Sequence, residues 1–192
     1  MKIIAATSNA GKLREIKKIF SSMEIISMKD AGIDIEVEEN GKTFEENALI
    51  KARAIAQMCD SPVLSDDSGL CVDVLGGAPG IYSARYAGEN ASDEEKYKKL
   101  LSELDGKTDR NAHFVSSVVL VYPDGRELTA EGAVHGRIGY EPKGENGFGY
   151  DPVFIPDELD GRTFAEASDD EKNSISHRKR ALTALFNKMS NE

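Results

Sequence analysis

The chain is poor in the residues that mark exported, membrane-spanning and metal-cluster proteins. Its 192 residues include two cysteines, three histidines and no tryptophan. Cys59 and Cys71 lack the spacing of metal ligands and are typical of reduced thiols rather than of a disulfide. No apolar run reaches the roughly 18 residues of a membrane span, and the N-terminal run is too short for a signal peptide. We therefore expect a cytoplasmic protein with no membrane partner.

Basic residues are also scarce relative to acidic ones. The 24 Lys and Arg are outnumbered by 34 Asp and Glu, which gives a formal net charge of −10. Proteins that bind polymeric DNA or RNA rely on basic surface to displace counterions, so we expect no nucleic-acid polymer as a partner. The charge still permits a small anion, because a local group of cations and backbone N–H groups can hold a phosphate in an acidic protein.

The length and the 40 % hydrophobic content suit one globular domain, 1–192, with a buried core. The pattern of the chain predicts a mixed α/β fold with at least one antiparallel hairpin. The predicted elements are a strand at Lys2–Ala6, a helix with Leu13, Ile16, Ile19 and Phe20 on one face, a helix capped by Thr43 and Glu46, a strand at Pro62–Ser65, a helix capped by Ser92 and Glu95, hairpin strands at His113–Tyr122 and Glu127–Val134, and a helix at about Ser176–Met189.

Two adjacent carboxylates, Asp66 and Asp67, follow the apolar run of the strand that we expect to end at Ser65. Burying neighbouring carboxylates is costly, because each loses water and repels the other. We expect them to face a divalent cation, a Lys or Arg, or a water that gives up a proton. An ordinary turn would also use Asp, Ser and Gly.

The segment Thr7–Lys12 lies between a predicted strand and a predicted helix, where α/β proteins often bind anions. It is not a Walker P-loop, since Ala6 stands where the first glycine is needed and Leu13 where Ser or Thr is needed. An ordinary strand-to-helix turn is the other interpretation.

Three acidic residues, Glu36, Glu38 and Glu39, gather ahead of Asn40. A solvated acidic edge explains them. One of them, together with one of the two adjacent aspartates, would also suit Mg²⁺, which takes one or two carboxylates and keeps its waters and substrate phosphate. Lys51, on the next predicted helix, is either a surface charge or a phosphate contact.

Two later segments carry further candidates. Phe148 stands between two glycines, where its ring could stack on a flat ligand or fill the core. Lys172, His177 and Arg178 gather ahead of the last helix. Capping by Ser174 or Ser176 explains part of that second segment but not its three basic side chains.

Six blocks of this sequence, in this order, resemble the inosine triphosphate pyrophosphatase family in its bacterial form. They run from the first strand to the last helix and so cover essentially the whole chain. The blocks are Thr7–Lys12, Glu38–Ala48, Ser65–Leu70, Leu75–Tyr86, Gly147–Pro152 and Asp170–Arg178.

The resemblance implies an elongated α/β protein with a long central mixed β-sheet flanked by helices, two lobes, an active site in the cleft between them, and a homodimer. It implies a hydrolase that cuts ITP, dITP and XTP between the α and β phosphates, with Mg²⁺ or in its place Mn²⁺. The products are a nucleoside monophosphate and pyrophosphate, and the reaction cleanses the nucleotide pool.

The resemblance also assigns roles. Glu38 and Asp67 would bind the metal, and Asp67 would accept the proton, as ligand, base or both, with Asp66 as the second carboxylate nearby. Phe148 would stack on the purine, and Lys172, His177 and Arg178 would close over base and phosphate. From the chemistry of the segment Ser176–Arg178 we further expect its hydrogen-bond donors, Arg178 among them, to favour a base with a C6 oxygen over one with an amino group. The substrate-binding residues that the resemblance implies are Thr7, Ser8, Asn9, Ala10, Gly11, Lys12, Lys51, Ser68, Phe148, Gly149, Tyr150, Asp151, Lys172, His177 and Arg178.

Two other functions remain as alternatives. One is a Maf-type pyrophosphatase that acts on other modified nucleotides; the blocks around Phe148 and His177 favour the purine family over it. The other is a nucleotide-binding module without catalysis. Such a module would be expected to lose a metal-binding carboxylate, whereas Glu38, Asp66 and Asp67 are all present.

Overall fold

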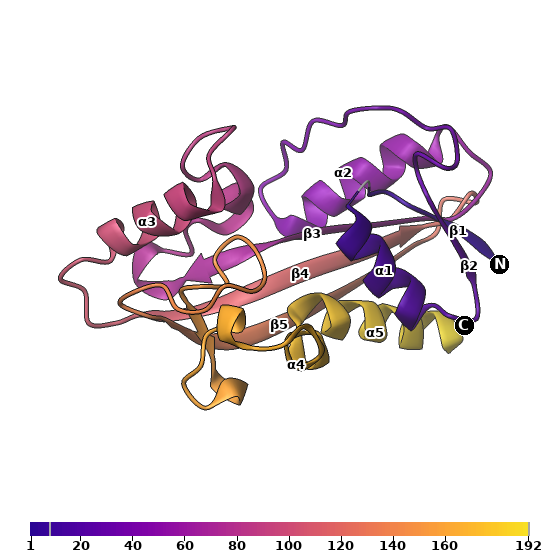
Figure 1. The fold of residues 1–192 in the computed structure, drawn as a ribbon. Helices are drawn as coiled ribbons and strands as arrows, with labels where there is room; N and C mark the ends of the chain where they lie inside the picture. Colours follow the sequence, from indigo (N-terminus) through magenta and orange to yellow (C-terminus); the bar gives the residue numbers. More distant parts are fainter. Residues whose placement is uncertain (8, 192) are drawn as a thin grey trace. The chain divides into compact units, whose positions relative to one another are not determined.

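In the computed structural model, which describes residues 1–7 and 9–191, the strands form a six-stranded mixed sheet with the order β2-β1-β3-β4-β5-β6 (Figure 1). β1 runs parallel to β2 and β3, and β5 runs antiparallel to β6. The strands are β1 Lys2–Ala5, β2 Glu24–Ser27, β3 Val63–Val72, β4 Asn111–Val121, β5 Glu127–Ile138 and β6 Phe154–Pro156. The predicted mixed α/β fold is thereby confirmed.

The helices begin where the sequence provides caps. The Thr43 hydroxyl accepts a hydrogen bond from the Glu46 N–H at 3.1 Å, and Ser92 and Glu95 form a complete capping box. No helix in the described ranges is long and apolar enough to cross a bilayer. The helices are α1 Ala10–Ile19, α2 Phe44–Ala56, α3 Asp93–Glu103, α4 Asp169–Ile175 and α5 His177–Ser190, with short 3₁₀ turns at Asp73–Leu75, Gly80–Arg85, Asp157–Leu159 and Phe164–Glu166.

The chain divides into two compact units that are discontinuous in sequence. Unit 1 comprises Met1–Asp67, Ser116–Gly132 and the chain from Arg178 onward, and unit 2 comprises Ser68–Val115 and Ala133–His177. Each unit has a core of its own.

The core of unit 1 has two layers because successive strand residues face opposite sides of a sheet. α1 and α5 cover one face, and α2 covers the other (Figure 1). The first layer includes Ile3, Ala5, Ile16, Phe20, Leu64, Val118, Leu120, Leu182 and Leu185. The second layer includes Ile4, Ala6, Ala48, Ala52, Ile55, Val63, Val119 and Val121.

Aromatic rings dominate the core of unit 2. Phe114 of β4 meets Phe154 of β6 edge-on, with ring centroids 4.8 Å apart, and Phe154 in turn contacts Phe164 at 5.2 Å. Leu100 in the last turn of α3 and Leu104 directly after it pack into the same core, and Tyr97 and Leu101 pack against it.

One predicted boundary is wrong. β3 does not end at Ser65 but continues through the two carboxylates to Val72. Leu70 and Val72 resume the apolar alternation and are fully buried in the core of unit 2, and this packing outweighs the turn preference of Asp, Ser and Gly. Asp66 and Asp67 therefore occupy the middle of a strand, where neighbouring side chains point to opposite faces.

Candidate active site

Asp66 is the centre of a buried ion-pair network in unit 1. Its carboxylate Oδ2 lies 2.8 Å from Lys12 Nζ and 3.1 Å from Arg178 Nε. The aspartate is only 2 % exposed. Burial acts to raise the pKa of Asp66, but the charges of Lys12 and Arg178 prevail and hold that pKa well below its usual range. Asp66 is therefore an ionised partner that keeps two cations in place.

Arg178 also faces a second carboxylate. Its Nη1 lies 3.5 Å from both carboxylate oxygens of Glu15, on α1. Burial acts to lower the pKa of Arg178, yet Asp66 and Glu15 raise it. Glu15 was not among the residues predicted from the sequence, and its contact with a residue 163 positions away leaves no local signal.

The N-terminus of α1, where the sequence predicted an anion site, is capped by Asn9. The Asn9 side chain caps the helix by accepting from the N–H groups of Gly11 at 2.8 Å and Lys12 at 3.1 Å. Thr7 Oγ1 accepts from the Asn9 N–H at 3.1 Å, and Ala10 begins the helix. Asn9, Ala10 and Gly11 are exposed, so this helix end is open to solvent. Ser8, also predicted here, lies outside the described residues.

Asp67 faces the opposite side of β3, toward α2. Its Oδ2 accepts a hydrogen bond from Asn47 Nδ2 at 3.0 Å, and Asn47 Oδ1 accepts from the Gly41 N–H at 2.8 Å. Asn47 thus joins Asp67 to the segment that contains the predicted metal ligand Glu38. A Cβ at Gly41 would lie 2.7 Å from Glu46 Cβ, so only glycine fits there.

The sequence analysis missed Asn47, although a signal was present. Asn47 is 2 % exposed and lies on the buried face of α2 beside Ala48. An amide on an apolar helix face needs a partner, because an unpaired buried polar group is costly.

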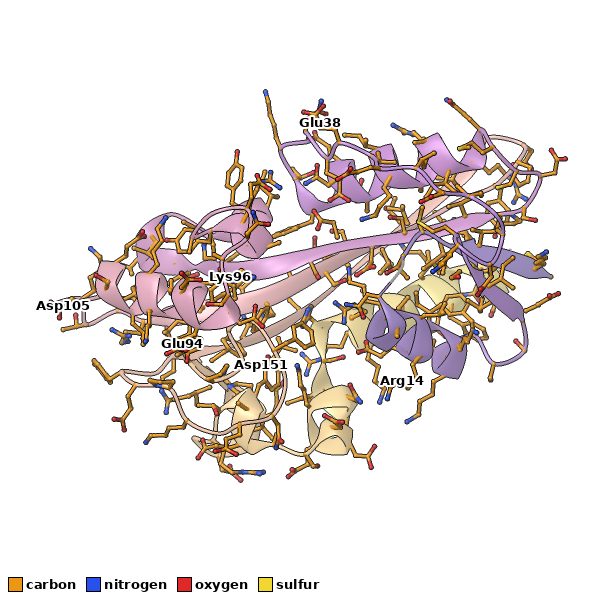
Figure 2. The ribbon with its side chains drawn as sticks, turned by 45° about the horizontal axis from the view of Figure 1, so that its top comes forward. Arg14, Glu38, Glu94, Lys96, Asp105 and Asp151 are labelled. Carbon is orange, nitrogen blue, oxygen red and sulfur yellow. The ribbon has the colours of Figure 1, made fainter. Side chains whose placement is uncertain are left out.

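The remaining predicted residues of unit 1 differ in their surroundings. Lys51 Nζ lies 2.6 Å from Glu39 Oε1, whereas Glu38 is exposed (Figure 2). The described ranges contain no cluster of three or more His, Cys, Asp or Glu side chains arranged to hold a metal ion. Glu38 and Asp67 are hard oxygen donors, and two carboxylates completed by water and phosphate match the ligands that Mg²⁺ takes in nucleotide enzymes.

Unit 2 contains the predicted base-binding residues, in a loop that we call the aromatic loop, residues 147–151. The Phe148 side chain is 63 % exposed, and Lys172 Nζ of α4 lies 4.4 Å from the centroid of its ring. The Phe148 N–H donates to Asp151 Oδ2 at 2.8 Å. A Cβ at Gly147, whose φ is +78°, would lie 2.1 Å from that same oxygen, so the loop requires glycine there.

Asp151 and Lys172 form a buried ion pair beneath the aromatic loop (Figure 2 labels Asp151). Burial raises the pKa of Asp151, against the opposing effect of the Lys172 ammonium. Tyr150 is 4 % exposed and donates its hydroxyl hydrogen to the Ser83 carbonyl at 2.8 Å. The ring of Tyr150 therefore lies in the core of unit 2, and it is Phe148 that faces solvent.

Three predicted residues, Ser68, His177 and Arg178, lie where the chain passes from one unit to the other. His177 and Arg178 are adjacent at the start of α5, with His177 in unit 2 and Arg178 in unit 1. The His177 ring is buried and stacks on Phe114 with centroids 5.0 Å apart, so its imidazole is largely surrounded by protein. Ser68, on β3, is half-buried.

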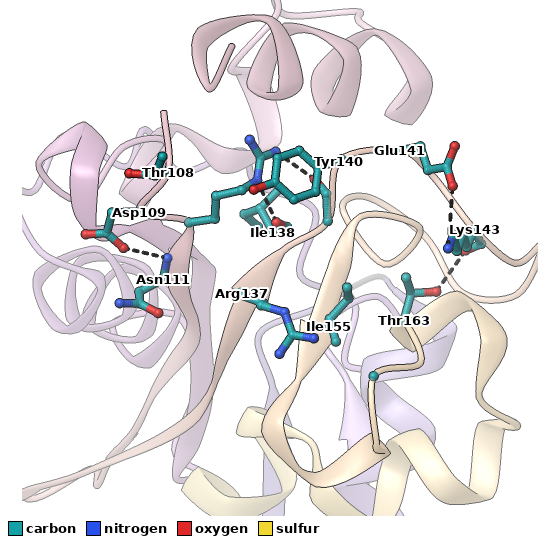
Figure 3. Close-up of a pocket in the computed structure, with 13 residues that line it drawn as sticks. Thr108, Asp109, Asn111, Arg137, Ile138, Tyr140, Glu141, Lys143, Ile155 and Thr163 are labelled. Carbon is teal, nitrogen blue, oxygen red and sulfur yellow. Dashed lines mark hydrogen bonds and ion pairs between the residues drawn. The ribbon is translucent and has the colours of Figure 1, made fainter. Parts of the chain in front are cut away.

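A cavity of about 510 Å³ in unit 2 is lined by none of the predicted site residues (Figure 3). Arg110 lies beside it and donates to the carbonyls of Ile138, Gly139 and Leu104 at 2.7–3.1 Å. The exposed Tyr140 ring stands over that guanidinium at 4.4 Å. These bonds satisfy Arg110 structurally, and we assign the cavity no part in the candidate site.

Comparisons with known proteins show the family and the fold of this chain. The family model described as Ham1 family matches residues 3–188. A dITP/XTP pyrophosphatase of Bacillus licheniformis is 50 % identical over 187 residues, which are 95 % of each chain. The structure of the Staphylococcus aureus Ham1 protein matches with a TM-score of 0.94 and 44 % identity, covering 100 % of this chain and 99 % of that one. The structure of a nucleoside-triphosphatase, dITP/XTP pyrophosphatase, from Mycobacterium abscessus matches with a TM-score of 0.83 and 42 % sequence identity. The match covers 98 % of this chain and 100 % of that one. The chain therefore belongs to the Ham1 family.

Proposed function

We propose that this chain removes non-standard purine nucleotides, ITP, dITP and XTP, from the nucleotide pool by Mg²⁺-dependent hydrolysis to the nucleoside monophosphate and pyrophosphate. It is a nucleoside triphosphate pyrophosphatase, because it belongs to the Ham1 family and is 50 % identical over almost its whole length to a dITP/XTP pyrophosphatase. The observation that carries the proposed mechanism is the convergence of Lys12 and Arg178 on Asp66 beside the open N-terminus of α1.

The cations of unit 1 are suited to hold a triphosphate in a fixed position. Lys12 and Arg178 are held by Asp66, and Lys51 is held by Glu39, so their side chains need little ordering when phosphate arrives. Each already faces a carboxylate, however, so their charges are partly offset. The charge of a triphosphate then calls for a further cation, which supports the requirement for Mg²⁺.

Glu38 and Asp67 would hold that Mg²⁺. When bound, the ion offsets charge on the phosphate oxygens. The hydrogen bond from Asn47 fixes one oxygen of Asp67 and thereby the direction of the carboxylate. A carboxylate fixed in this way can orient a water and take its proton as the water oxygen bonds to the α-phosphorus and pyrophosphate departs.

The base would stack on Phe148. Lys172 lies over one face of this ring, and the exposed side chain offers the other to a purine. Stacking of this kind adds affinity for any purine, so the choice of base must come from polar contacts.

The proposal also includes a cytoplasmic location and a homodimer, both of which the family resemblance implies. The Maf-type alternative is not favoured, since the curated relatives are dITP/XTP pyrophosphatases.

The test is a substrate panel with separate detection of pyrophosphate and orthophosphate. We expect ITP, dITP and XTP to give pyrophosphate at rates well above ATP, GTP and dTTP, and we expect excess EDTA to abolish turnover. Mn²⁺ should restore it after dialysis. Release of orthophosphate, a preference for dTTP, or full turnover in EDTA would each contradict the proposal.

A further inference from the structure

The position of the Phe148 ring depends on the backbone of the aromatic loop. The ring is mostly exposed, so the core does not hold it. Gly147 and Gly149 have φ values of +78° and +64°, a region that glycine enters without strain and from which it departs as easily. Within the loop, the Phe148 N–H donates to Asp151 Oδ2, and the Asp151 N–H donates to the Phe148 carbonyl at 3.2 Å. A precise ring position therefore calls for contacts from outside the loop.

One outside contact comes from the 3₁₀ turn Gly80–Arg85. The Tyr150 hydroxyl donates to the Ser83 carbonyl. Ser83 is itself fixed, because its Oγ accepts from the Leu70 N–H at 2.9 Å and donates to the Gly80 carbonyl at 2.6 Å. This chain of bonds holds the C-terminal side of the aromatic loop against β3. Ser83, which belongs to the Leu75–Tyr86 block, thus helps to support the loop.

A further outside contact, besides Ser83 and the Lys172 side chain of α4, is Asp93, the first residue of α3. Its Oδ2 accepts the Gly149 N–H at 2.7 Å across 56 positions of sequence, and its Oδ1 accepts from Lys96 Nζ at 3.1 Å. Because Tyr97, Leu100 and Leu101 pack α3 against the core of unit 2, the bond to Gly149 ties the loop to a helix that this core holds in place. Figure 2 labels Lys96 and Glu94 on α3.

Capping of α3 does not require Asp93. Ser92 Oγ accepts from the Glu95 N–H, and Glu95 accepts in return from the Ser92 N–H, so the helix start is satisfied by other residues. Burial acts to raise the pKa of Asp93, but the bonds from Gly149 and Lys96 lower it. The carboxylate is consequently ionised at neutral pH, and its bond to a backbone N–H is of the stronger, charge-assisted kind.

We infer that Asp93 is a positioning residue that fixes the aromatic loop, and with it Phe148, for stacking on the substrate base. The inference rests on the proposed function of Phe148. Without Asp93 the Gly149 N–H loses its partner and the loop samples other conformations, so fewer molecules present the ring correctly. The binding-competent fraction then falls, and KM rises by the same factor.

The experiment compares four variants of the full-length chain. Asp93→Ala removes the acceptor, and Asp93→Asn restores one through its amide oxygen. Lys96→Gln removes only the partner of the other carboxylate oxygen. Glu94→Gln removes a neighbouring first-turn carboxylate that pairs with Lys98, and so controls for the helix N-terminus.

We expect Asp93→Ala to raise KM for ITP about five- to tenfold with kcat changed less than about twofold, and Asp93→Asn to recover most of the loss. The two control variants should stay within about twofold of the wild type in both constants. Hydrogen exchange of the Gly149 amide should accelerate in Asp93→Ala alone. The amide of Leu100, in α3 of the same unit, is the internal reference and should exchange at the wild-type rate. Equal acceleration at Leu100 would indicate general unfolding and would overturn the positioning role.

Two results separate this inference from the proposed function. Unchanged Gly149 exchange or unchanged KM in Asp93→Ala overturns the role of Asp93 while leaving ITP hydrolysis intact. Lack of ITP turnover by the wild type overturns the proposed function itself and, with it, the role of Asp93 in base stacking.

Discussion

Asp66 and Asp67 are adjacent in sequence, yet their carboxylates lie on opposite faces of β3. Asp66 contacts Lys12 and Arg178 from α1 and α5, and Asp67 contacts Asn47 from α2. The strand thus avoids the repulsion that two neighbouring carboxylates would feel on one face. The two carboxylates therefore have separate surroundings. Asp66 holds two cations, and under the proposed function Asp67 would bind the metal and the attacking water.

The first prediction concerns Asp67. Asp67→Asn keeps the size of the side chain but removes the charge needed to bind a metal and accept a proton. We expect kcat on ITP to fall by a factor of about 10² or more, with a melting temperature close to that of the wild type. Pyrophosphate release and thermal unfolding measure the two effects. Turnover within a few-fold of the wild type would move the catalytic role to another carboxylate.

The second prediction concerns Asp66 and acid. Its folded-state pKa is lowered from the ordinary 3.8, so the unfolded chain binds this proton first as the pH falls. The stability that ionised Asp66 contributes is therefore complete above about pH 4 and is lost as the pH falls below its ordinary pKa. Asp66→Asn should cost about 3 kcal/mol of unfolding free energy at pH 7, because it removes the carboxylate charge that faces buried Arg178 and half-buried Lys12.

Urea unfolding of wild type and Asp66→Asn between pH 7 and pH 3 tests this directly. The difference in unfolding free energy between wild type and Asp66→Asn should be constant from pH 7 down to about pH 4 and should become smaller below pH 4. A difference in unfolding free energy that stays constant or widens as the pH falls from 4 to 3 would show that the pKa of Asp66 is not lowered.

The third prediction concerns Phe148. Phe148→Ala removes the stacking surface, and stacking of a base on an aromatic side chain contributes about 1–3 kcal/mol. We expect kcat/KM to fall roughly tenfold or more on ITP and on ATP alike, because every purine has a face to stack. Phe148→Tyr serves as the control and should retain most activity. A large change in the ITP/ATP ratio would mean that Phe148 selects the base.

The fourth prediction concerns Arg178, for which the structure changes the expectation. The sequence analysis made Arg178 a selector of the C6 oxygen, so that Arg178→Ala would shrink the preference for ITP over ATP. Its burial between Asp66 and Glu15 favours a role at the phosphates instead. We now expect Arg178→Ala to lower kcat/KM on both substrates with their ratio preserved. If the ratio of kcat/KM on ITP to that on ATP falls toward one in Arg178→Ala, then Arg178 does select the C6 oxygen of the base.

The parts of the fold that the sequence predicted well are those determined by local interactions. The capping residues Thr43 and Ser92, and the tight turn that joins β4 to β5, act within a few positions, so their patterns are visible in the sequence. The short strands β2 and β6 and the helix α4 were not predicted. Two of them are only three or four residues long and depend on pairing with distant strands, as Ile138 does with Phe154.

The candidate site shows the same division. The blocks identified the residues with distinctive chemistry, such as Lys12 and Phe148. They did not identify the residues that hold these in place, because Glu15, Asn47 and Asp93 act through contacts with partners far away in the sequence. The extent of β3 was misjudged for a related reason, since its second half is determined by packing in the core of unit 2 and not by local preference.

Because β3 is continuous from Val63 to Val72, it tolerates substitutions better than insertions or deletions. Deleting or inserting one residue in the first half of the strand would turn every later side chain to the other face. Asp66 would then face α2, Asp67 would face Lys12, and Leu70 and Val72 would leave their core. Insertions in relatives should therefore collect in the connecting loops, while the spacing from Val63 to Val72 stays constant even where the residues themselves differ.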